Sequence, residues 1–441
     1  MGHLQLLLAA IALTAGAVWS TVSAQAAPID TPLQMLGMDD AGGLIAFVTP
    51  AGAAALVDPV RGERALLDDG PGRSQFPAWA PGGALVSFIA FGPGGDGAGL
   101  DVHDPATGTS LRVFERPQES PIYHGWSPDG ERIALLTSRI GGLGLHLVDP
   151  TADAAAAADD EASERAAGDA EPFAVGAPFY WDWAPDGGAL LVHRNVLGPD
   201  AEVGRSGLAA YDPTPTRAPP GAFQSPAVSP SGAWIAYASR DGADARRVVL
   251  ERGEGASDGE PDLRELPHAG LAALAWHPNL DVLAIQRPLI DAPHSYGPIV
   301  TIDARTGDLE TLTDDLSLAF WWSPDGGTVA YLAPAPGGGD GPERQVGLQV
   351  QAGSARVALR VVDVATGLRR ELGRFTPSPL FLNQYLPFFD QYARSHRLWS
   401  PSSDALVLPV QGGGVSVLTV FGLDGGVRTL GSGDMPAWNV R

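Results

Sequence analysis

The chain has 441 residues with 56 Gly, 39 Pro and no Cys, and 44% of its residues are hydrophobic. Its formal net charge is −23 at pH 7, which argues against nucleic acid or an anionic lipid surface as partner, because both need a positively charged face. The lack of Cys excludes disulfides, thiolate metal sites and a Cys nucleophile.

The N-terminal segment carries an apolar run from Leu4 to Trp19, followed by small and polar residues. This pattern is typical of a secretory signal peptide, which we place at residues 1–26 with a linker at 27–35. No Lys or Arg precedes the run, so an uncleaved anchor or a misassigned start are the alternatives. No later run approaches the roughly 18 apolar residues of a membrane span. We therefore expect an exported protein in the periplasm, at the cell surface or outside the cell.

One motif recurs along the rest of the chain: an aromatic residue, a Ser-Pro-Asp-Gly-like turn and a strand of alternating apolar residues. Its clearest copies are GWSPDGERIALLTSR from residue 125 and WWSPDGGTVAYLA from residue 321, and further copies begin at residues 78, 182, 227, 275 and 398. Two intervals are longer than the base period, which matches that of a four-stranded propeller blade.

The two ends of the chain complement each other. A degenerate copy from Met38 lacks the aromatic-Pro start, and the C-terminal MPAWNVR supplies Trp438 where the motif aromatic belongs. A strand that arrives from the C-terminus closes the repeat and removes free sheet edges. We predict a single closed all-β propeller over residues 36–441 with eight four-stranded blades, or seven if the N-terminal copy is not a complete blade.

The repeated aromatic and turn residues are assigned to structure. Pro and Gly suit a turn, and Asp can bond the following backbone. A packing device must recur in each blade, whereas a catalytic group need not. We therefore expect the motif tryptophans to pack between adjacent sheets: Trp79, Trp126, Trp183, Trp276, Trp322, Trp399 and Trp438.

These residues resemble the TolB-like β-propeller repeat, whose signature is W-S-P-D-G followed by an apolar strand. Related repeats form the propeller of dipeptidyl-peptidase-type enzymes. The resemblance implies a propeller and favours protein partners in the cell envelope. It is weak for function because the motif builds blades whatever the protein does. Val228 replaces Trp in one copy, and Asn279-Leu280 replaces Asp-Gly in another.

Two insertions interrupt the repeat. Residues 151–172 are rich in Ala and acidic residues, so we expect a solvated spacer, with an acidic docking arm as the alternative. Residues 376–397 combine aromatic and ionisable side chains. They predict either a lid that packs its aromatics on the preceding blade or a segment that presents Asp390, Arg394 and His396 to a ligand.

The innermost strand of each blade borders the channel of a propeller, and the segments entering each Pro turn are aromatic with a few polar groups. That composition is expected of a binding mouth, although many of these side chains could equally be core. The candidate ligand-binding residues are Tyr123, His124, Tyr180, Asp182, Trp321, Asp390, Arg394, His396 and Arg397.

Motifs for a nucleophile elbow, a zinc protease, an EF-hand and a phosphate loop are all missing from the sequence. We therefore expect a monomeric, non-catalytic propeller, without metal or cofactor, that binds a protein segment or a small-molecule or carbohydrate ligand at its channel face. The alternative is a lyase or hydrolase acting on sugar or peptide through His124, Asp182, Asp390, Arg394 and His396. A purely structural surface protein is the third possibility.

Overall fold

A computed structural model describes residues 43–67, 70, 72–95, 97–153, 171–195, 201–221, 224–241, 245–253, 263–288, 294–335 and 356–439. The expected signal peptide, the linker and most of the acidic insertion at 151–172 lie outside the described residues. Within these ranges, none of the helices has the length and apolarity needed to cross a membrane.

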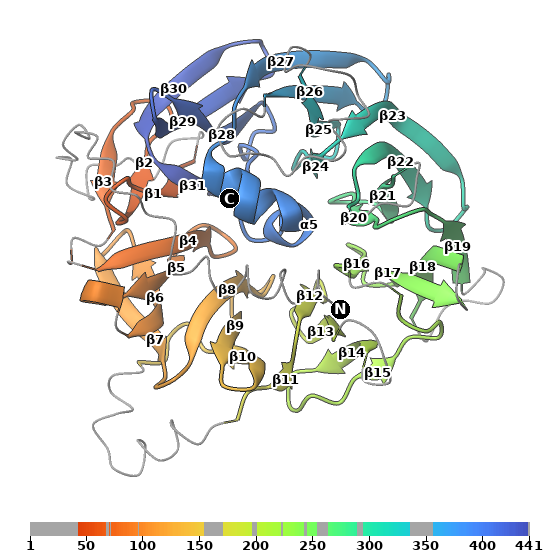
Figure 1. Ribbon diagram of the computed structural model, residues 1–441, viewed down its shortest axis with the longest axis horizontal. Coiled ribbons are helices and arrows are strands. Elements are labelled where there is room, and N and C mark those ends of the chain that lie inside the picture. The colour runs from red at the N-terminus through yellow and green to blue at the C-terminus, as the bar shows by residue number, and fades with distance from the viewer. Residues whose placement is uncertain are drawn as a thin grey trace. The chain divides into compact units, whose positions relative to one another are not determined.

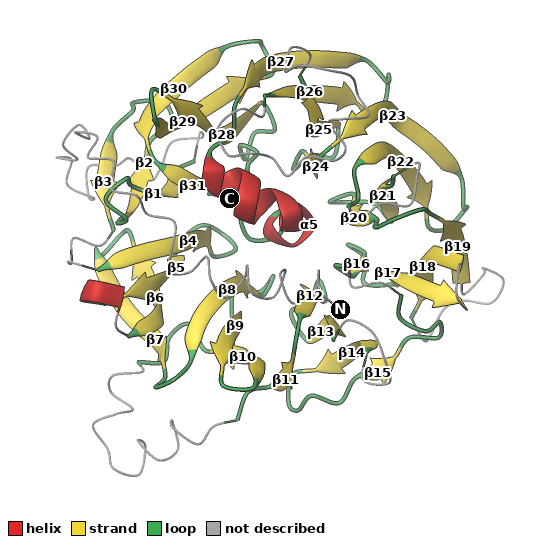
Figure 2. Cartoon of the chain, in the orientation of Figure 1, coloured by secondary structure: helices red, strands yellow, loops and turns green. Residues whose placement is uncertain are grey.

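The fold is an all-β propeller of eight blades, as the repeat predicts, and not of seven (Figure 1). Its strands are antiparallel and, except where β31 joins β1, follow one another in chain order within each sheet, and helices are few (Figure 2). The chain divides into two compact units, residues 1–178 with 432–441 and residues 179–431. Each unit is described by itself below.

The first unit contains three blades, and the last strand of the chain completes the first of them. Strand β31 pairs with β1, so that Ile45 lies opposite Trp438. The strands are β31 (Asp434–Trp438), β1 (Ile45–Val48), β2 (Ala54–Val57) and β3 (Arg64–Leu66); β4 (Arg73–Trp79), β5 (Val86–Phe91), β6 (Ala98–Asp104) and β7 (Thr109–Glu115), with the 3-10 turn η2 (Pro93–Gly95); and β8 (Ser120–Trp126), β9 (Ile133–Arg139), β10 (Gly142–Val148) and β11 (Ala174–Gly176).

The second unit contains five blades. In the last of them the bridge between Trp399 and Leu406 stands where the innermost strand belongs. The strands are β12 (Phe179–Trp183), β13 (Ala189–Arg194), β14 (Glu202–Gly207) and β15 (Thr214–Pro215); β16 (Ala227–Val228), β17 (Trp234–Asp241), β18 (Ala245–Arg252) and β19 (Leu263–Pro267); β20 (Ala273–Trp276), β21 (Val282–Gln286), β22 (Gly297–Asp303) and β23 (Leu309–Ser317); β24 (Ala319–Trp322), β25 (Thr328–Pro334), β26 (Val357–Asp363) and β27 (Arg369–Phe375); and β28 (Ala405–Gly412), β29 (Val415–Gly422) and β30 (Val427–Ser432).

Three motif tryptophans, Trp79, Trp322 and Trp399, join neighbouring blades by a hydrogen bond of one kind. In each case the indole Nε1 donates to the carbonyl just before the motif aromatic of the preceding blade. Trp322 donates to Ala275 at 3.1 Å, and Trp79 donates to Ala437 at 3.0 Å. In the second of these bonds the acceptor, Ala437, lies on β31, which is therefore the innermost strand of the first blade. Buried aromatic plates with a satisfied N–H are well suited to such an interface.

The Ser-Pro-Asp-Gly turn has the geometry that its residues favour. Gly130 adopts a φ of 74° and donates its N–H to the carbonyl of Ser127 at 2.9 Å. Asp129 accepts from the N–H of Glu131 at 3.0 Å. Where the motif has His277 in place of Ser, the ring Nδ1 accepts the N–H of Asn279 at 3.0 Å. The turn is therefore maintained by different side chains that accept the same kind of bond.

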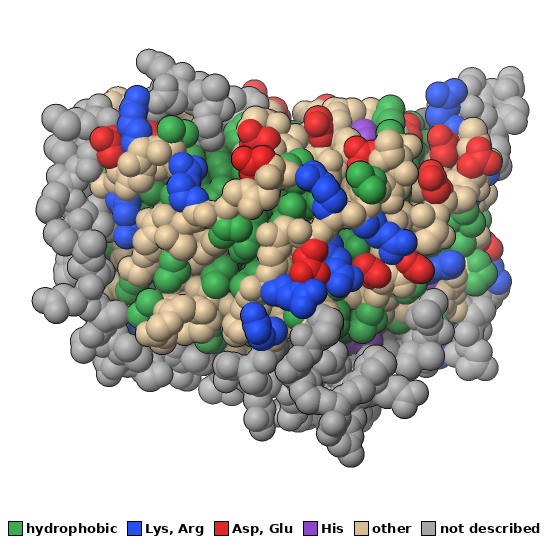
Figure 3. Space-filling model, turned by 90° about the horizontal axis from the view of Figure 1, so that it is seen from above, with side chains coloured by type: hydrophobic (Ala, Val, Ile, Leu, Met, Phe, Trp, Pro, Cys, Tyr) green, Lys and Arg blue, Asp and Glu red, His purple; other side chains and the backbone are tan. Residues whose placement is uncertain are grey.

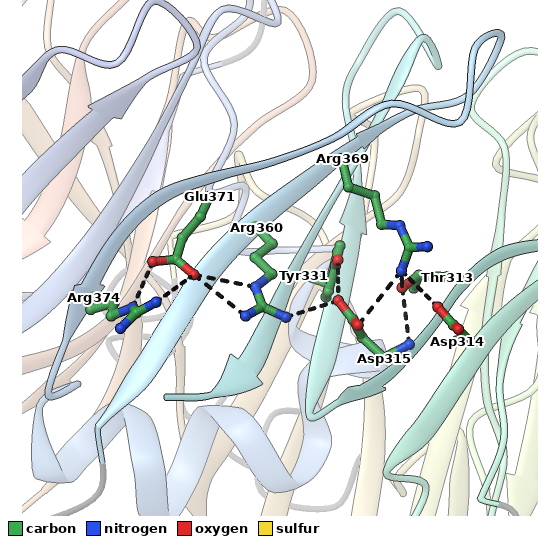
Figure 4. Close-up of polar contacts among 8 residues, drawn as sticks. All are labelled: Thr313, Asp314, Asp315, Tyr331, Arg360, Arg369, Glu371 and Arg374. Atoms are coloured by element: carbon green, nitrogen blue, oxygen red, sulfur yellow. Dashed lines mark hydrogen bonds and ion pairs between the residues drawn. The ribbon is translucent and has the colours of Figure 1, made fainter. Parts of the chain in front are cut away.

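On the outer strands of the second unit, a charged network links two blades. Arg360 of β26 donates to Asp315 of β23 at 2.9 Å, and Arg369 of β27 donates to Asp314 at 2.6 Å (Figure 4). Figure 3 shows Arg and acidic side chains side by side on one face of the molecule. Exposed ion pairs contribute about 0–1 kcal/mol each, so this network is a modest brace. The network includes Arg369 of β27, the strand that leads into the insertion at 376–397.

Candidate functional site

The insertion at 376–397 forms a helical segment in three short pieces: η3 (Phe381–Tyr385), η4 (Leu386–Phe388) and α5 (Phe389–Tyr392). Ser378 starts it, because its hydroxyl accepts the N–H of Phe381 at 3.1 Å. Pro387 has no N–H to donate, which interrupts the regular ladder of an α-helix. The helical spacing of the aromatics and the interruption at this proline were both visible in the sequence.

One side of the helical segment packs into the core of the second unit. Phe381 and Phe389 are buried against Trp321 of β24, with ring centroids 6.5 Å and 6.1 Å from it. Tyr385 stacks on Phe381 at 4.8 Å, and its hydroxyl accepts the indole N–H of Trp321 at 3.2 Å. This aromatic side is core packing, so Trp321 lies in the interior beneath the segment.

The other side of the helical segment covers the free edge of β12. Gln391 accepts the backbone N–H of Trp181 at 3.2 Å, and Arg394 donates to the carbonyl of the same residue at 2.7 Å. Arg394 also donates to the carbonyl of Pro226, just before β16, at 2.6 Å. An innermost strand has unpaired backbone groups on one edge, and these two side chains satisfy that edge.

Asp182 and Arg394, two of the residues singled out in the sequence, lie together. The guanidinium Nη1 is 3.5 Å from Asp182 Oδ1, and the two side chains are 22% and 19% exposed. Asp182 Oδ2 accepts the N–H of Val228 at 2.8 Å, which ties β12 to β16. Burial raises the pKa of Asp182, and the nearby guanidinium opposes that rise.

Asp390 lies half-buried in the first turn of α5. Its Oδ1 accepts the N–H of Gln391 at 3.0 Å, and within the described part of the chain Oδ2 accepts no hydrogen bond. Burial raises the pKa of Asp390 to about 6, against the opposing charge of Arg394. The ring of Tyr180 on β12 lies 6.3 Å from that of Phe388. Burial and the charge of Asp390 together hold the pKa of Tyr180 above its ordinary value.

Arg397 follows the helical segment and precedes the last blade. Its side chain is exposed, and among the described residues it has neither an ion-pair nor a hydrogen-bond partner. The protein that surrounds it nevertheless removes enough water to lower its pKa to about 10. Arg397 is thus a guanidinium that reaches solvent without a neutralising carboxylate from this part of the chain.

The histidines proposed from the sequence occupy the interior. His396 is 2% exposed, and its Nδ1 lies 2.8 Å from the hydroxyl of Ser395. In the first unit, His124 is fully buried, and its Nε2 lies 2.8 Å from the hydroxyl of Ser87. Burial lowers the pKa of His124 to about 3, so the ring is neutral. Tyr123 is buried beside it on β8.

Gln391 was not singled out in the sequence, although it lies in the segment that was. Its contact with Trp181 joins residues 210 positions apart. The local sequence pattern around either residue does not predict such a contact. Across the ranges that the structure describes, no group of three or more His, Asp or Glu could hold a metal ion. The chemistry on offer is therefore a half-buried carboxylate, an exposed guanidinium and neighbouring aromatic rings.

No family model matches this sequence, and no curated protein sequence matches it either. Three solved structures resemble the fold. A eukaryotic initiation factor shares 10% identity at a TM-score of 0.51, covering 91% of this chain and 99% of that one. A prolyl endopeptidase shares 12% identity at 0.50, covering 83% and 50%. TolB from Acinetobacter baumannii shares 14% identity at 0.38, covering 74% and 62%.

This chain therefore spans half of the prolyl endopeptidase and less than two thirds of that TolB chain. Identities this low show a common fold and no more. The similarities to the initiation factor and the prolyl endopeptidase agree with the β-propeller topology described above.

Proposed function

We propose that this protein is an exported, non-catalytic β-propeller that binds a protein segment at the surface formed by α5 and β12. The observation that carries the proposal is that Arg394 and Gln391 form hydrogen bonds to the backbone of Trp181 at the free edge of β12. Their bonds fix the helical segment, so that Asp390 and Arg397 stand on a rigid support with polar atoms that reach solvent. Preorganised polar groups beside aromatic rings are what a recognition surface requires.

Binding is favoured over catalysis by the state of the two histidines. A general base must lie within hydrogen-bonding reach of the proton that it takes from a substrate. His124 and His396 are both buried, and each ring is already close to a serine hydroxyl. Neither is placed to serve a ligand that arrives from solvent.

One observation favours an enzyme as the second candidate. Asp390 has a pKa of about 6, a value that suits a general acid or base near neutral pH. A lyase or hydrolase on sugar or peptide would use this carboxylate beside Arg397 and Tyr180. This candidate predicts turnover that is lost in Asp390→Asn.

Export and the choice of a protein partner rest on the sequence alone. The apolar run before residue 27 supports export, and the W-S-P-D-G repeat, with its resemblance to TolB-like propellers, supports a protein partner. N-terminal sequencing of the protein recovered from outside the cytoplasm tests the first point, and processing near residue 26 is the expected result.

The binding experiment uses the processed full chain against an array of peptides taken from envelope proteins. We expect micromolar binding that weakens at least tenfold in Arg397→Gln and is unchanged in Asp314→Asn, an exposed control on the outer strand β23. The absence of any bound peptide would contradict the proposal. Cleavage of peptides or oligosaccharides that Asp390→Asn abolishes would establish the enzyme instead.

A further inference from the structure

Asp390 in the helical segment and Arg397 just after it are partly shielded from water by the surrounding protein, yet each lacks a charged partner among the described residues. Asp390 Oδ2 accepts no hydrogen bond from the described residues, and Arg397 has no described partner. A charge that is partly removed from water costs free energy unless it is paired. Arg360 of the same unit, by contrast, is paired with both Asp315 and Glu371 (Figure 4).

The two unpaired charges do not neutralise each other. No hydrogen bond or ion pair links Asp390 with Arg397, and among the described residues Arg394 is the cation that lowers the pKa of Asp390. Arg394 cannot serve Asp390 fully, since its guanidinium is already bonded to the carbonyls of Trp181 and Pro226. A carboxylate and a guanidinium therefore face solvent as separate charges in one short stretch of chain.

Aromatic rings adjoin the carboxylate, and one of them, that of Tyr180, is buried. Phe388 precedes α5 and is half-buried, and its ring lies 6.3 Å from that of Tyr180. The face of an aromatic ring attracts a cation, and the ring buries the stem of a long cationic side chain. These rings favour an ammonium or guanidinium group over a metal ion as the partner of Asp390.

We propose that the surface recognises two opposite charges of one peptide segment: Asp390, flanked by Phe388 and Tyr180, binds an ammonium or guanidinium group, and Arg397 binds a carboxylate. This inference rests on the proposed function and assigns the chemistry of its ligand. Binding of a ligand carboxylate also explains why Arg397 has no carboxylate partner among the described residues, although the chain as a whole has a net charge of −23. The two contacts are separate and can be tested one at a time.

The charged and titratable groups around Asp390 set how its contact depends on pH. Tyr180 faces it from β12, Tyr392 and Arg394 lie on its own segment, and Asp182 of β12 pairs with that same Arg394. Strands β20 and β24 also pack against α5, and their sequences ALAW and AFWW contain no ionisable residue. Protonation of Asp390 is therefore the expected event near pH 6, and the cation contact weakens below that pH.

The test uses three small probes and saturation-transfer NMR on the full chain: benzylammonium, benzoate and neutral benzyl alcohol. Both charged probes should bind more tightly than the alcohol. Asp390→Asn should weaken benzylammonium at least fivefold and leave benzoate unchanged or stronger, and Arg397→Gln should do the reverse. Asp314→Asn, which removes the same charge from the outer strand β23, should change neither.

The crossed pattern of losses separates recognition from a change in net charge or a failure to fold. Equal binding of all three probes, or a charged probe that binds Asp390→Asn and Arg397→Gln as it binds the wild type, would overturn the inference. If peptides bind the wild type but neither substitution weakens them, the proposed function stands and this inference is wrong. If the probes show the crossed pattern and no peptide binds, the charge assignment stands and the protein-binding function is wrong.

Discussion

Arg394→Met isolates the contribution of the guanidinium that holds the helical segment on β12. The substitution keeps the aliphatic stem and removes hydrogen bonds of 2.7 Å and 2.6 Å to two carbonyls, together with the ion pair at 3.5 Å to Asp182. A hydrogen bond from a charged donor contributes about 1.5–3 kcal/mol. Water reaches a side chain that is 22% exposed, so we take about 1 kcal/mol for each bond and as much for the ion pair.

The expected loss is about 3 kcal/mol, which raises the population of the open segment roughly 100-fold. Hydrogen exchange followed by mass spectrometry measures it, because the N–H of Trp181 is protected by Gln391 and exchanges when the segment leaves β12. Peptides covering 179–183 and 389–396 should exchange roughly 100-fold faster. Arg374→Met is the control: the Arg374 side chain is 45% exposed and pairs with Glu371. It should change the exchange rate of both peptides less than threefold. If β12 in Arg394→Met exchanges within threefold of the wild-type rate, Arg394 does not hold the helical segment on β12. The packing of the aromatic side chains would then hold it there.

Three further predictions follow from the contacts of single residues. Trp322→Phe should lower stability by about 1 kcal/mol more than Trp276→Phe, measured by urea unfolding, because Trp322 donates to Ala275 whereas the indole nitrogen of Trp276 has no partner among the described residues; equal losses would contradict the role of that bond. Burial lowers the pKa of His124 to about 3 and of His193 to about 4 from 6.5, so the unfolded chain takes up protons first as the pH falls. Each ring then costs about 2 kcal/mol of stability between pH 7.5 and 5. His124→Gln should remove about half of the stability that the two rings together lose between pH 7.5 and 5. A profile of stability against pH that matches the wild type would contradict this role of His124. Asp390 has the opposite sign, since a pKa raised to about 6 means that the folded state is penalised as the pH rises. Asp390→Asn should stabilise the protein by about 1 kcal/mol at pH 7.5, after allowance for solvent, and by less at pH 5, which thermal melts at the two pH values would show.

The blades were predictable because their signal is local and repeated. Each copy carries a turn, a strand pattern and an aromatic in the same order, so a weak copy such as that around Val228 is identified by its neighbours. The closing strand was predictable too, since the first copy lacks a motif aromatic and Trp438 is a motif aromatic without a Pro turn behind it. Repetition compensates for the low information content of any single strand.

The candidate site was predictable only in part. The mixture of aromatic and charged residues at 376–397 marked the helical segment, and alternation along β12 put Tyr180 and Asp182 on one face. The contact of Gln391 with Trp181 joins distant segments and leaves no trace in local periodicity. His124 could not be placed either, because its neighbours Tyr123 and Trp126 are large on both faces of β8, and no polar face marks the solvent side.

The pairing of β1 with β31 has a consequence for how the protein is made. Residue 45 lies opposite residue 438, so the first blade lacks its inner strand until the ribosome has added residue 438. Up to that moment β1 offers an open backbone edge to any other extended chain. Contacts between such distant positions also form slowly. We therefore expect the first blade to be completed after the blades whose strands are contiguous in the sequence.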